Sequence, residues 1–471
     1  MSFLDQSIPR RAVLKRAIAA STVAQLPTMA RSAADSPTDR PHIVFILADD
    51  LGWGDLSCYG QTDYSTPMLD QLASQGQRFM QGYSNSAVCS ATRTALITGR
   101  YQYRYRVGLE EPLSGRNTPY GLPADTPTLP GQLQAAGYRT VLVGKWHLGY
   151  PPGYGPLKSG YESFYGNLGS GVDYFTHKDG VAPKGERDFW DGNSPVNAHG
   201  YYTDLLSDRA VQEVMKCQGD PRPLFLSLHY TAPHWPWEGP QDEATSATIK
   251  SLSHLNGGSL AIYGRMVQAM DNGIGKVLAA LRQIGAERNT IVVFTSDNGG
   301  ERFSRTWPFS GQKTELLEGG IRVPLIVRWP AQLGAGVCDQ VAISMDLSPT
   351  LLAAAGAQPI PSDGIDLLPM MQEGVVKSRK LYWRYKAHGQ QALRDGDYKY
   401  LFIKKNEFLF DLKADQRERA NLARVQPERL AAMRADWAQW NEQMLPIPAG
   451  AFTHAVGGKT QADRYGVDSI D

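Results

Sequence analysis

The sequence has few cysteines, and none are spaced for a structural role. Cys58, Cys89, Cys217 and Cys338 lie far apart and form no C-x-x-C pair. Zinc sites and disulfide-rich scaffolds depend on closely spaced cysteines, so neither is expected. A chain of 471 residues buries about three-quarters of its extended surface without any cross-link. Its stability must therefore come from a hydrophobic core.

An excess of charge is also missing. Lys and Arg number 48 and Asp and Glu 47, so the formal net charge is only +1. A globally basic surface for nucleic acid or an anionic membrane is therefore not expected, whereas a local basic pocket is compatible with this composition. Downstream of the N-terminal region there is no run of about 18 uncharged apolar residues, which argues against a stable membrane span. A hydrophobic content of 42% is typical of a folded globular protein.

Residues 1–34 have the features of an export signal. The Arg10-Arg11 pair is followed by an uncharged, mildly apolar stretch from Ala17 to Ala30 and by small residues up to Ala34. This order predicts a twin-arginine-type signal peptide, and hence the twin-arginine export machinery as a partner and a periplasmic or secreted protein. Pro9 and Val13 depart from the usual signal, and a basic amphipathic tail is the alternative. Residues 35–40 are interpreted as a linker.

Between residues 41 and 370, apolar segments of strand length alternate with helical patterns. The predicted strands are His42–Leu47, Thr140–Val143, Leu224–Leu228, Thr290–Thr295 and Val323–Arg328. The predicted helices cover Leu129–Ala136, Thr203–Lys216 and Leu260–Ile284, and two more begin at Thr66-Pro67 and Ser348-Pro349. Such alternation predicts an α/β domain with a large, mostly parallel sheet and helices on both faces.

The pattern changes after about residue 370. Four short strands are predicted at Leu381–Tyr385, Gln391–Arg394, Tyr398–Ile403 and Phe408–Leu412, and a helix at Pro427–Gln443. Closely spaced strands joined by turns such as Asp395-Gly396-Asp397 predict a small antiparallel sheet, which the helix covers. Residues 371–471 are therefore interpreted as a C-terminal α+β subdomain with a tail.

Polar residues follow the predicted strands of the first domain at their carboxyl ends, where ligands bind in open parallel sheets. They are Asp49, Asp50, Lys145, His147, His234, Asp297 and Asn298. Taken singly, each motif is an ordinary turn or loop. Together, the carboxylates and the amide provide the hard oxygen ligands that suit Ca²⁺, with Mg²⁺ as the competitor. Lys145, His147, His234 and Lys313 would surround that ion with donors, an arrangement that favours an anionic substrate such as a sulfate or phosphate ester.

The segment from Cys89 to Arg100 reads Cys-Ser-Ala-Thr-Arg-Thr-Ala-Leu-Ile-Thr-Gly-Arg. On a helix, Cys89 and Arg93 lie on one face because they are four residues apart. With the G-K-W-H-L-G motif that begins at Gly144 and the D-N-G motif at Asp297, this segment resembles the sulfatase family of the alkaline phosphatase superfamily. The family pattern is C-x-P-x-R followed by T-G-R, and this sequence has Ala91 where proline is usual. The resemblance continues into the C-terminal region, from Leu409 to Ala423.

The resemblance implies an alkaline phosphatase-like fold, a catalytic domain over residues 41–370 and a role for each site residue. A formylglycine-generating enzyme would oxidise Cys89 to formylglycine. One hydroxyl of the aldehyde hydrate would attack sulfur, and the other would later expel sulfate as the aldehyde re-forms. The implied metal ligands are Asp49, Asp50, Asp297, Asn298 and the modified Cys89. Arg93 would hold the hydrate, Lys145 would bridge it to the sulfate and His147 would contact its hydroxyls, while His234 and Lys313 would bind the sulfate and assist the leaving oxygen.

The implied reaction is hydrolysis of a small-molecule or saccharide sulfate monoester. Two alternatives remain open: a phosphodiesterase or phosphonate monoester hydrolase of the same superfamily, and a non-catalytic metal-dependent binding protein in which Cys89 stays a thiol. The sequence does not choose between aryl and carbohydrate substrates, because both stack on aromatic rings. The candidates for such a ring-binding cleft are Tyr101, Tyr103, Tyr105, Trp235 and Trp237.

Overall fold

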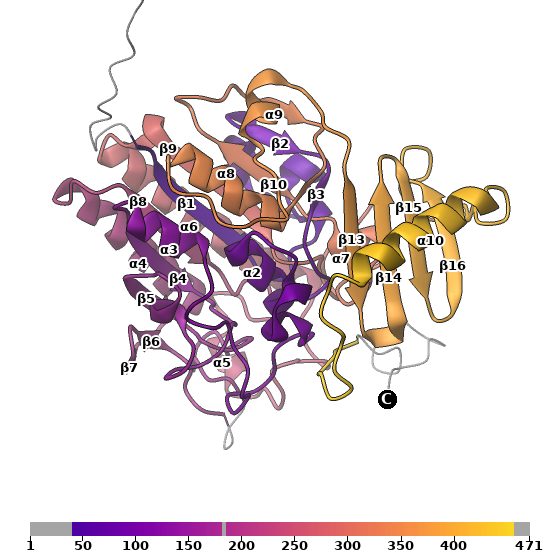
Figure 1. The fold of residues 1–471 in the computed structure, drawn as a ribbon. Coiled ribbons are helices and arrows are strands. Elements are labelled where there is room, and N and C mark those ends of the chain that lie inside the picture. Colours follow the sequence, from indigo (N-terminus) through magenta and orange to yellow (C-terminus); the bar gives the residue numbers. More distant parts are fainter. Residues whose placement is uncertain (1–39, 181–184, 456–471) are drawn as a thin grey trace, which may run out of the picture. The chain divides into compact units, whose positions relative to one another are not determined.

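The computed structural model describes residues 40–180 and 185–455, so the predicted signal peptide and nearly all of the linker lie outside the described residues. Within the described part of the chain, the main element is a ten-stranded sheet (Figure 1). Its spatial order is β11 (Gly336–Cys338), β2 (Gln77–Phe79), β10 (Leu325–Arg328), β9 (Thr290–Ser296), β1 (His42–Ala48), β8 (Leu224–His229), β4 (Arg139–Gly144), β5 (Ser163–Gly166), β6 (Trp190–Asp191) and β7 (Ser194–Pro195).

The central strands β9, β1, β8, β4 and β5 run parallel, whereas β10, β6 and β7 pair antiparallel with their neighbours. The prediction of a large, mostly parallel sheet is confirmed. The side chains of β1 show why it is central: Val44 and Ile46 join the core on one face, and Ile43 and Phe45 join the core on the other. Successive side chains of a strand point to opposite faces, so a strand buried on both sides is apolar throughout.

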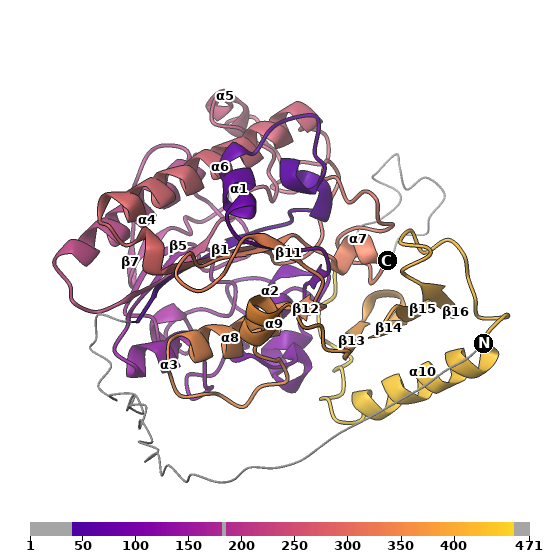
Figure 2. The same ribbon diagram turned by 90° about the horizontal axis from the view of Figure 1, so that it is seen from above.

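Helices cover both faces of this sheet (Figure 2). On one face lie α1 (Pro67–Ser74), α4 (Tyr202–Met215) and α6 (Leu260–Gln283), and the short α5 (Glu243–Ser246) lies beyond them. On the other face lie α2 (Cys89–Thr98), α3 (Leu129–Ala135), α8 (Leu347–Ala354) and α9 (Leu368–Glu373). The short helix α7 (Glu318–Ile321) and a two-stranded sheet of β3 (Gly82–Tyr83) and β12 (Ala342–Ile343) complete this part.

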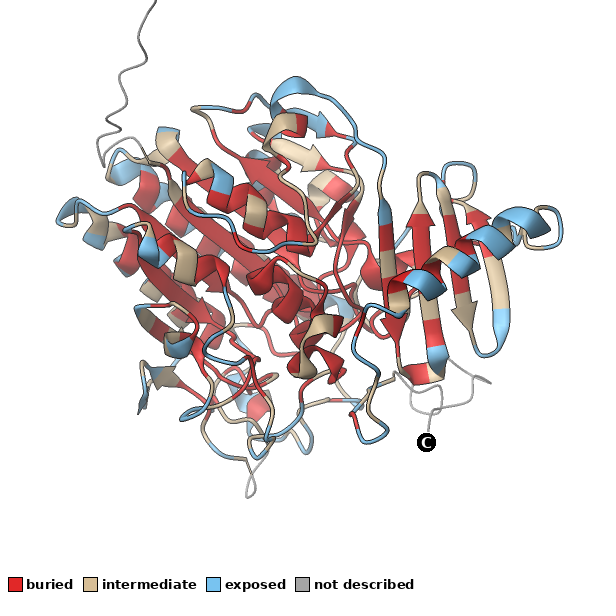
Figure 3. Ribbon diagram, in the orientation of Figure 1, coloured by how far each residue is buried: buried red, intermediate tan, exposed pale blue. Residues whose placement is uncertain are grey.

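The C-terminal part is an antiparallel sheet of four strands in sequence order, as predicted. They are β13 (Lys380–Tyr385), β14 (Gln390–Asp395), β15 (Tyr398–Ile403) and β16 (Asn406–Asp411). Helix α10 (Pro427–Asn441) packs Met433, Trp437 and Trp440 against this sheet and exposes its other face (Figure 3).

The C-terminal sheet shares a hydrophobic core with the helix that carries Cys89. Ala91 and Ala95 of α2 belong to the same buried cluster as Leu381 and Trp383 of β13. The Trp383 indole N–H also donates a hydrogen bond to the Ser84 carbonyl oxygen at 2.9 Å. The C-terminal sheet therefore supports the back of α2. The division into domains at residue 370 stays a prediction.

Candidate active site

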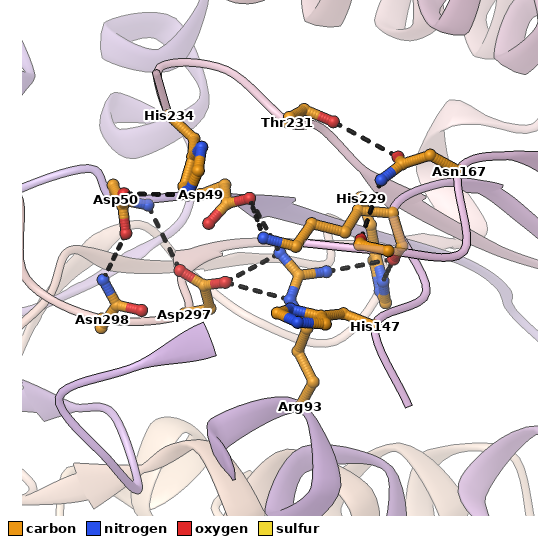
Figure 4. Close-up of polar contacts among 12 residues, drawn as sticks. Asp49, Asp50, Arg93, His147, Asn167, His229, Thr231, His234, Asp297 and Asn298 are labelled. Atoms are coloured by element: carbon orange, nitrogen blue, oxygen red, sulfur yellow. Dashed lines mark hydrogen bonds and ion pairs between the residues drawn. The ribbon is translucent and has the colours of Figure 1, made fainter. Parts of the chain in front are cut away.

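Three aspartates meet at the carboxyl ends of two adjacent central strands. Asp49 and Asp50 follow β1, and Asp297 follows β9. Carboxylate oxygens of the three lie within 4.8 Å of one another, and all three residues are buried. Figure 4 shows them facing one another across the strand ends. Asp50 has a φ of 62°, which is uncommon outside glycine, and its backbone N–H donates to Asp297 Oδ1 at 3.3 Å.

Asn298 completes the oxygen-rich side of the cluster. Its Nδ2 donates to Asp50 Oδ1 at 2.7 Å, while its own Oδ1 is buried without a hydrogen-bond partner. Asp49 Oδ1 is likewise buried and unpartnered. Buried oxygens without donors are rare because they lose hydration without compensation. Two such oxygens beside three carboxylates fit a hard divalent cation.

Cys89 is the first residue of α2 and points into the same cluster. Atoms of Asp49, Cys89 and His234 that can bind a metal lie within 4.8 Å of one another. Burial raises the pKa of the Cys89 thiol to about 12, so an unmodified Cys89 stays protonated. A protonated thiol is a poor nucleophile and a poor metal ligand.

Arg93 lies one helical turn after Cys89 and points toward the aspartates (Figure 4). Its Nε and Nη2 donate to Asp297 Oδ2 at 3.0 and 2.8 Å, and its Nη1 donates to the Lys145 carbonyl oxygen at 3.1 Å. Arg93 thereby connects α2, β9 and the end of β4. The predicted placement of Cys89 and Arg93 on one helical face is confirmed.

Lys145 and His147 follow β4 directly. Lys145 is fully buried, and its Nζ donates to Asp49 Oδ2 at 2.5 Å. Gly144 precedes it and lets the chain pass close to β8, because a Cβ on Gly144 would lie 1.9 Å from the His229 carbonyl oxygen. His147 has a φ of 59° and an Nε2 that lies 2.8 Å from the Leu113 carbonyl oxygen. Its Nδ1 is buried without a partner, and it is the nitrogen that remains for a ligand.

His234 and Lys313 lie on the side of Asp50. Lys313 Nζ donates to Asp50 Oδ2 at 2.6 Å, and His234 Nε2 lies 3.6 Å from the same oxygen. His234 Nδ1 faces the Trp235 carbonyl oxygen at 2.7 Å, which leaves Nε2 directed toward the cluster. Burial alone would raise the pKa of Asp50, but the charges of Lys313 and His234 and hydrogen bonds from Lys313 and Asn298 lower it overall.

The site is electrostatically balanced. Three carboxylates face three cationic side chains, those of Arg93, Lys145 and Lys313. Burial and the neighbouring Asp49 carboxylate raise the pKa of Asp297 to about 7, so added positive charge would favour its ionised form. A dication would leave the whole cluster with a positive surplus. Such a site attracts an anion.

Two residues that the sequence analysis did not single out lie beside this cluster. Glu301 Oε2 lies 3.9 Å from Lys313 Nζ. The charges of Lys313 and Asp50 also act on His454, whose pKa is lowered by burial and by Lys313. His454 is exposed, and it belongs to a segment whose Thr453 forms a parallel bridge with Glu111. No local sequence motif marks either residue, because loop closure and the C-terminal segment bring them there.

The aromatic candidates have different positions. Tyr101 and Tyr103 are buried and contact the Trp440 ring, with centroids 5.1 and 5.6 Å away. Trp237 is buried beneath the Arg302 guanidinium group. These three rings stabilise the fold and do not line a cleft. Tyr105 and Trp235 are half-buried. Tyr105 packs against the hydrophobic core, whereas the Trp235 ring centroid lies 4.0 Å from that of His234.

Fold and site together define a hydrolase for an anionic ester. Residues 41–357 match the family described as Sulfatase, and residues 311–438 match the family described as N-sulphoglucosamine sulphohydrolase, C-terminal. The chain therefore belongs to the sulfatase family of sulfuric ester hydrolases, which cleave sulfate esters.

Several relatives agree with this assignment. N-acetylgalactosamine-6-sulfatase of Rattus norvegicus is 34% identical over 385 residues, which is 76% of this chain and 71% of the relative. Arylsulfatase A of Homo sapiens is 32% identical over 414 residues, 80% of this chain and 77% of the relative. Among solved structures, that of Ps i-CgsB matches with a TM-score of 0.79 at 30% identity and covers 88% of this chain and 95% of its own.

Proposed function

We propose that this protein hydrolyses sulfate monoesters of saccharides with a formylglycine made from Cys89 and a bound Ca²⁺ ion. The observation that carries the proposal is the position of Cys89 beside Asp49 and His234, within the 4.8 Å cluster. A cysteine with a raised pKa has little use there as a thiol. Formylglycine supplies, when present, the hydroxyl that attacks the ester.

The residues proposed to hold the metal are Asp49, Asp50, Asp297 and Asn298, together with the modified Cys89. Their support is the pair of unpartnered oxygens on Asp49 and Asn298 and the grouping of the three carboxylates. Ca²⁺ accepts several oxygen ligands in flexible geometry, which fits three carboxylates and an amide better than a strictly octahedral ion does. A bound divalent ion supplies charge that stabilises the sulfate oxygens.

The surrounding side chains have separate proposed roles. Arg93 and Lys145 hold position 89 and the sulfate, because both side chains reach the aspartate cluster. His147 offers Nδ1 to the hydroxyls at position 89, since its Nε2 is engaged by the Leu113 carbonyl oxygen. His234 and Lys313 lie on the leaving-group side. His234 Nδ1 carries the proton that it donates to the Trp235 carbonyl oxygen, so the imidazolium form is the one that directs a second proton from Nε2 toward the departing oxygen. Positioning and charge stabilisation are the main tasks in this type of transfer.

Saccharide esters are proposed as substrates because two relatives point to them. One is named for N-acetylgalactosamine 6-sulfate, and Ps i-CgsB is described in complex with k-i-k-neocarrahexaose. Hydrolysis is proposed to occur after export through the twin-arginine route, with Cys89 converted beforehand by a formylglycine-generating enzyme. Among the described residues, no helix is long and apolar enough to cross a membrane.

The test is Cys89→Ser, with Cys58→Ser as a matched control distant from the aspartate cluster. Peptide mass spectrometry of the purified protein should show a fraction of Cys89 with the thiol sulfur replaced by an aldehyde oxygen. Cys89→Ser should keep the thermal unfolding midpoint close to that of the control and lose all turnover, because serine cannot release sulfate by re-forming a carbonyl. Full activity of Cys89→Ser on sulfate esters would contradict the proposal. A preference of the fully modified enzyme for phosphate diesters over every sulfate ester would favour the alternative hydrolase.

A further inference from the structure

Glu301 lies in the loop between β9 and α7, and the loop closes so that Glu301 and Lys313 become neighbours. The Lys313 backbone N–H donates to the Gly300 carbonyl oxygen at 3.0 Å, and the Ser304 N–H donates to the Glu301 carbonyl oxygen at 2.7 Å. Arg302 anchors the loop through hydrogen bonds to the carbonyl oxygens of His254 and Leu255. The loop backbone is therefore fixed on both sides of Glu301.

One oxygen of this carboxylate lacks a donor. Glu301 Oε2 is buried without a hydrogen-bond partner. Its distance of 3.9 Å to Lys313 Nζ is too long for a hydrogen bond. Lys313 Nζ directs its hydrogen bond to Asp50 instead, at 2.6 Å. A buried carboxylate oxygen left in this state is unfavourable unless a ligand or water donates to it.

The exposed fractions show on which side of the site Glu301 lies. Lys145 is 0% exposed, Lys313 is 3% exposed and Glu301 is 9% exposed, and the neighbouring Trp235 is half-buried. Glu301 is therefore closer to the entrance than the residues assigned to the sulfate. Because a carboxylate repels a sulfate group and accepts from donors, the substrate group that pairs with it is an O–H or N–H in the rest of the substrate.

Trp235 provides the second half of this entrance. Its side chain acts on Glu301 and lowers the pKa of that carboxyl against the larger effect of burial, and its ring centroid lies 5.9 Å from Lys313 Nζ. A sugar ring has apolar C–H faces and hydroxyls at its edge. An aromatic face beside an unpartnered carboxylate oxygen offers complementary contacts to both.

On the basis of the function proposed above, we propose that Glu301 determines substrate specificity. Its Oε2 accepts a hydrogen bond from the saccharide hydroxyl closest to the sulfate ester, while Trp235 contacts the sugar ring. Lys313 connects cleavage of the ester with recognition of the sugar. Its Nζ donates to Asp50 in the aspartate cluster and lies 3.9 Å from Glu301 Oε2. The enzyme should therefore select esters that have a free hydroxyl next to the sulfated position.

The experiment compares a parent sugar sulfate with its deoxy analogues in three proteins. N-acetylgalactosamine 6-sulfate, galactose 6-sulfate and galactose 4-sulfate are first assayed with the wild-type enzyme, and the best substrate is paired with analogues that lack one neighbouring hydroxyl. The ratio of kcat/KM between the parent sugar and each analogue is then measured for wild type, Glu301→Ala and the exposed control Glu428→Ala. A hydrogen bond to a charged group predicts a wild-type preference of about 10- to 100-fold for the parent sugar.

The expected result is that the preference disappears in Glu301→Ala, with a ratio near one, and persists in Glu428→Ala. If Glu301 only positions Lys313, both substrates slow equally and the ratio stays at its wild-type value, which would overturn the proposal. A wild-type enzyme that shows no preference, or that cleaves 4-nitrophenyl sulfate but no sugar sulfate, would overturn it as well. A fully modified enzyme that cleaves no sulfate ester would instead contradict the proposed function itself.

Discussion

Arg93 donates two hydrogen bonds to a single oxygen of Asp297, from Nε at 3.0 Å and from Nη2 at 2.8 Å. Both side chains are buried, with exposed fractions of 2% and 0%. The contact joins the helix that begins with Cys89 to the strand that ends at the proposed metal site. Catalytic geometry and stability therefore depend on the same pair of residues.

Replacing Arg93 with alanine should affect both properties. The buried Asp297 carboxylate would lose its partner, and breaking a buried ion pair in this way destabilises a protein by about 3–5 kcal/mol. Chemical denaturation should show this loss, and activity on 4-nitrophenyl sulfate should fall below detection. Arg424→Ala, an exposed control, should change stability by less than about 0.5 kcal/mol. If Arg93→Ala keeps the stability of the wild-type protein, the buried Asp297 carboxylate does not depend on its ion pair with Arg93.

Metal binding should stabilise the folded protein. Ca²⁺ at 100 times its dissociation constant should add about 2.7 kcal/mol, because it binds only the folded state. Thermal unfolding should therefore shift upward with Ca²⁺ and downward with a chelator. Asp297→Asn should reduce this response, whereas the exposed Asp125→Asn should retain it. If neither Ca²⁺ nor Mg²⁺ shifts the thermal unfolding midpoint, this result would contradict the proposed metal ligands.

His234→Ala should discriminate between leaving groups. A proton from this side chain matters most when the departing oxygen is basic, and general acid catalysis contributes about 10²- to 10⁴-fold. We expect kcat/KM to fall by about that factor for sugar sulfates and by much less for 4-nitrophenyl sulfate. His199→Ala, an exposed histidine outside the site, is the control. Equal losses on both substrate types would place His234 in sulfate binding alone.

Glu238 should make stability depend on pH. Burial raises the pKa of its carboxyl to about 8, from a value of 4.5. The folded state then holds a proton that the unfolded state releases between these pH values. Stability from this group is present below about pH 4.5 and falls by up to about 1.4 kcal/mol per pH unit as the pH rises toward 8. Denaturation at pH 5.5 and 7.5 should show a smaller difference for Glu238→Gln than for wild type or the exposed control Glu243→Gln. Identical pH dependence in all three would refute this assignment.

Export should depend on the arginine pair at the N-terminus. Changing Arg10 and Arg11 to lysine should leave the protein in the cytoplasm, since the twin-arginine machinery reads that pair. Cell fractionation of the exporting host, with sulfatase activity measured in each fraction, checks this. Substituting Lys15 and Arg16 with glutamine in a separate variant controls for general charge. Unchanged export of the double lysine variant would mean that the N-terminal region has another function.

The sequence was sufficient for the main elements of the fold. His42–Leu47 and Thr290–Thr295 each contain at least four consecutive apolar residues, a composition and length typical of strands buried on both faces. The structure confirms them as β1 and β9, each extended by one residue. The very short strands β6 and β7 were not foreseen. Two-residue strands such as Ser194–Pro195 carry no periodicity and form only because a neighbouring strand is present.

The site could be foreseen because its residues follow strands of one parallel sheet. Asp49, Lys145, His234 and Asp297 come from four distant segments, yet parallel strands present their carboxyl ends at one edge. Once the strands were identified, these four residues could therefore be expected to lie close together at that edge of the sheet. The positions of the aromatic residues could not be foreseen, because aromatic residues occur in binding clefts and in hydrophobic cores alike. Tyr101 and Tyr103 lie in a core, where Trp440 of α10 contacts both rings.

The sequence by itself determined the chemistry, since the cysteine segment and the strand-end carboxylates are local patterns with fixed spacing. Only the tertiary structure decided which side chains surround that chemistry. Glu301 faces Lys313 because the loop between them closes through backbone hydrogen bonds. The charges of the site act on His454 because its segment pairs with Glu111, 342 residues away from Thr453. Contacts of this kind depend on packing between distant segments, and no local pattern of residue types encodes them.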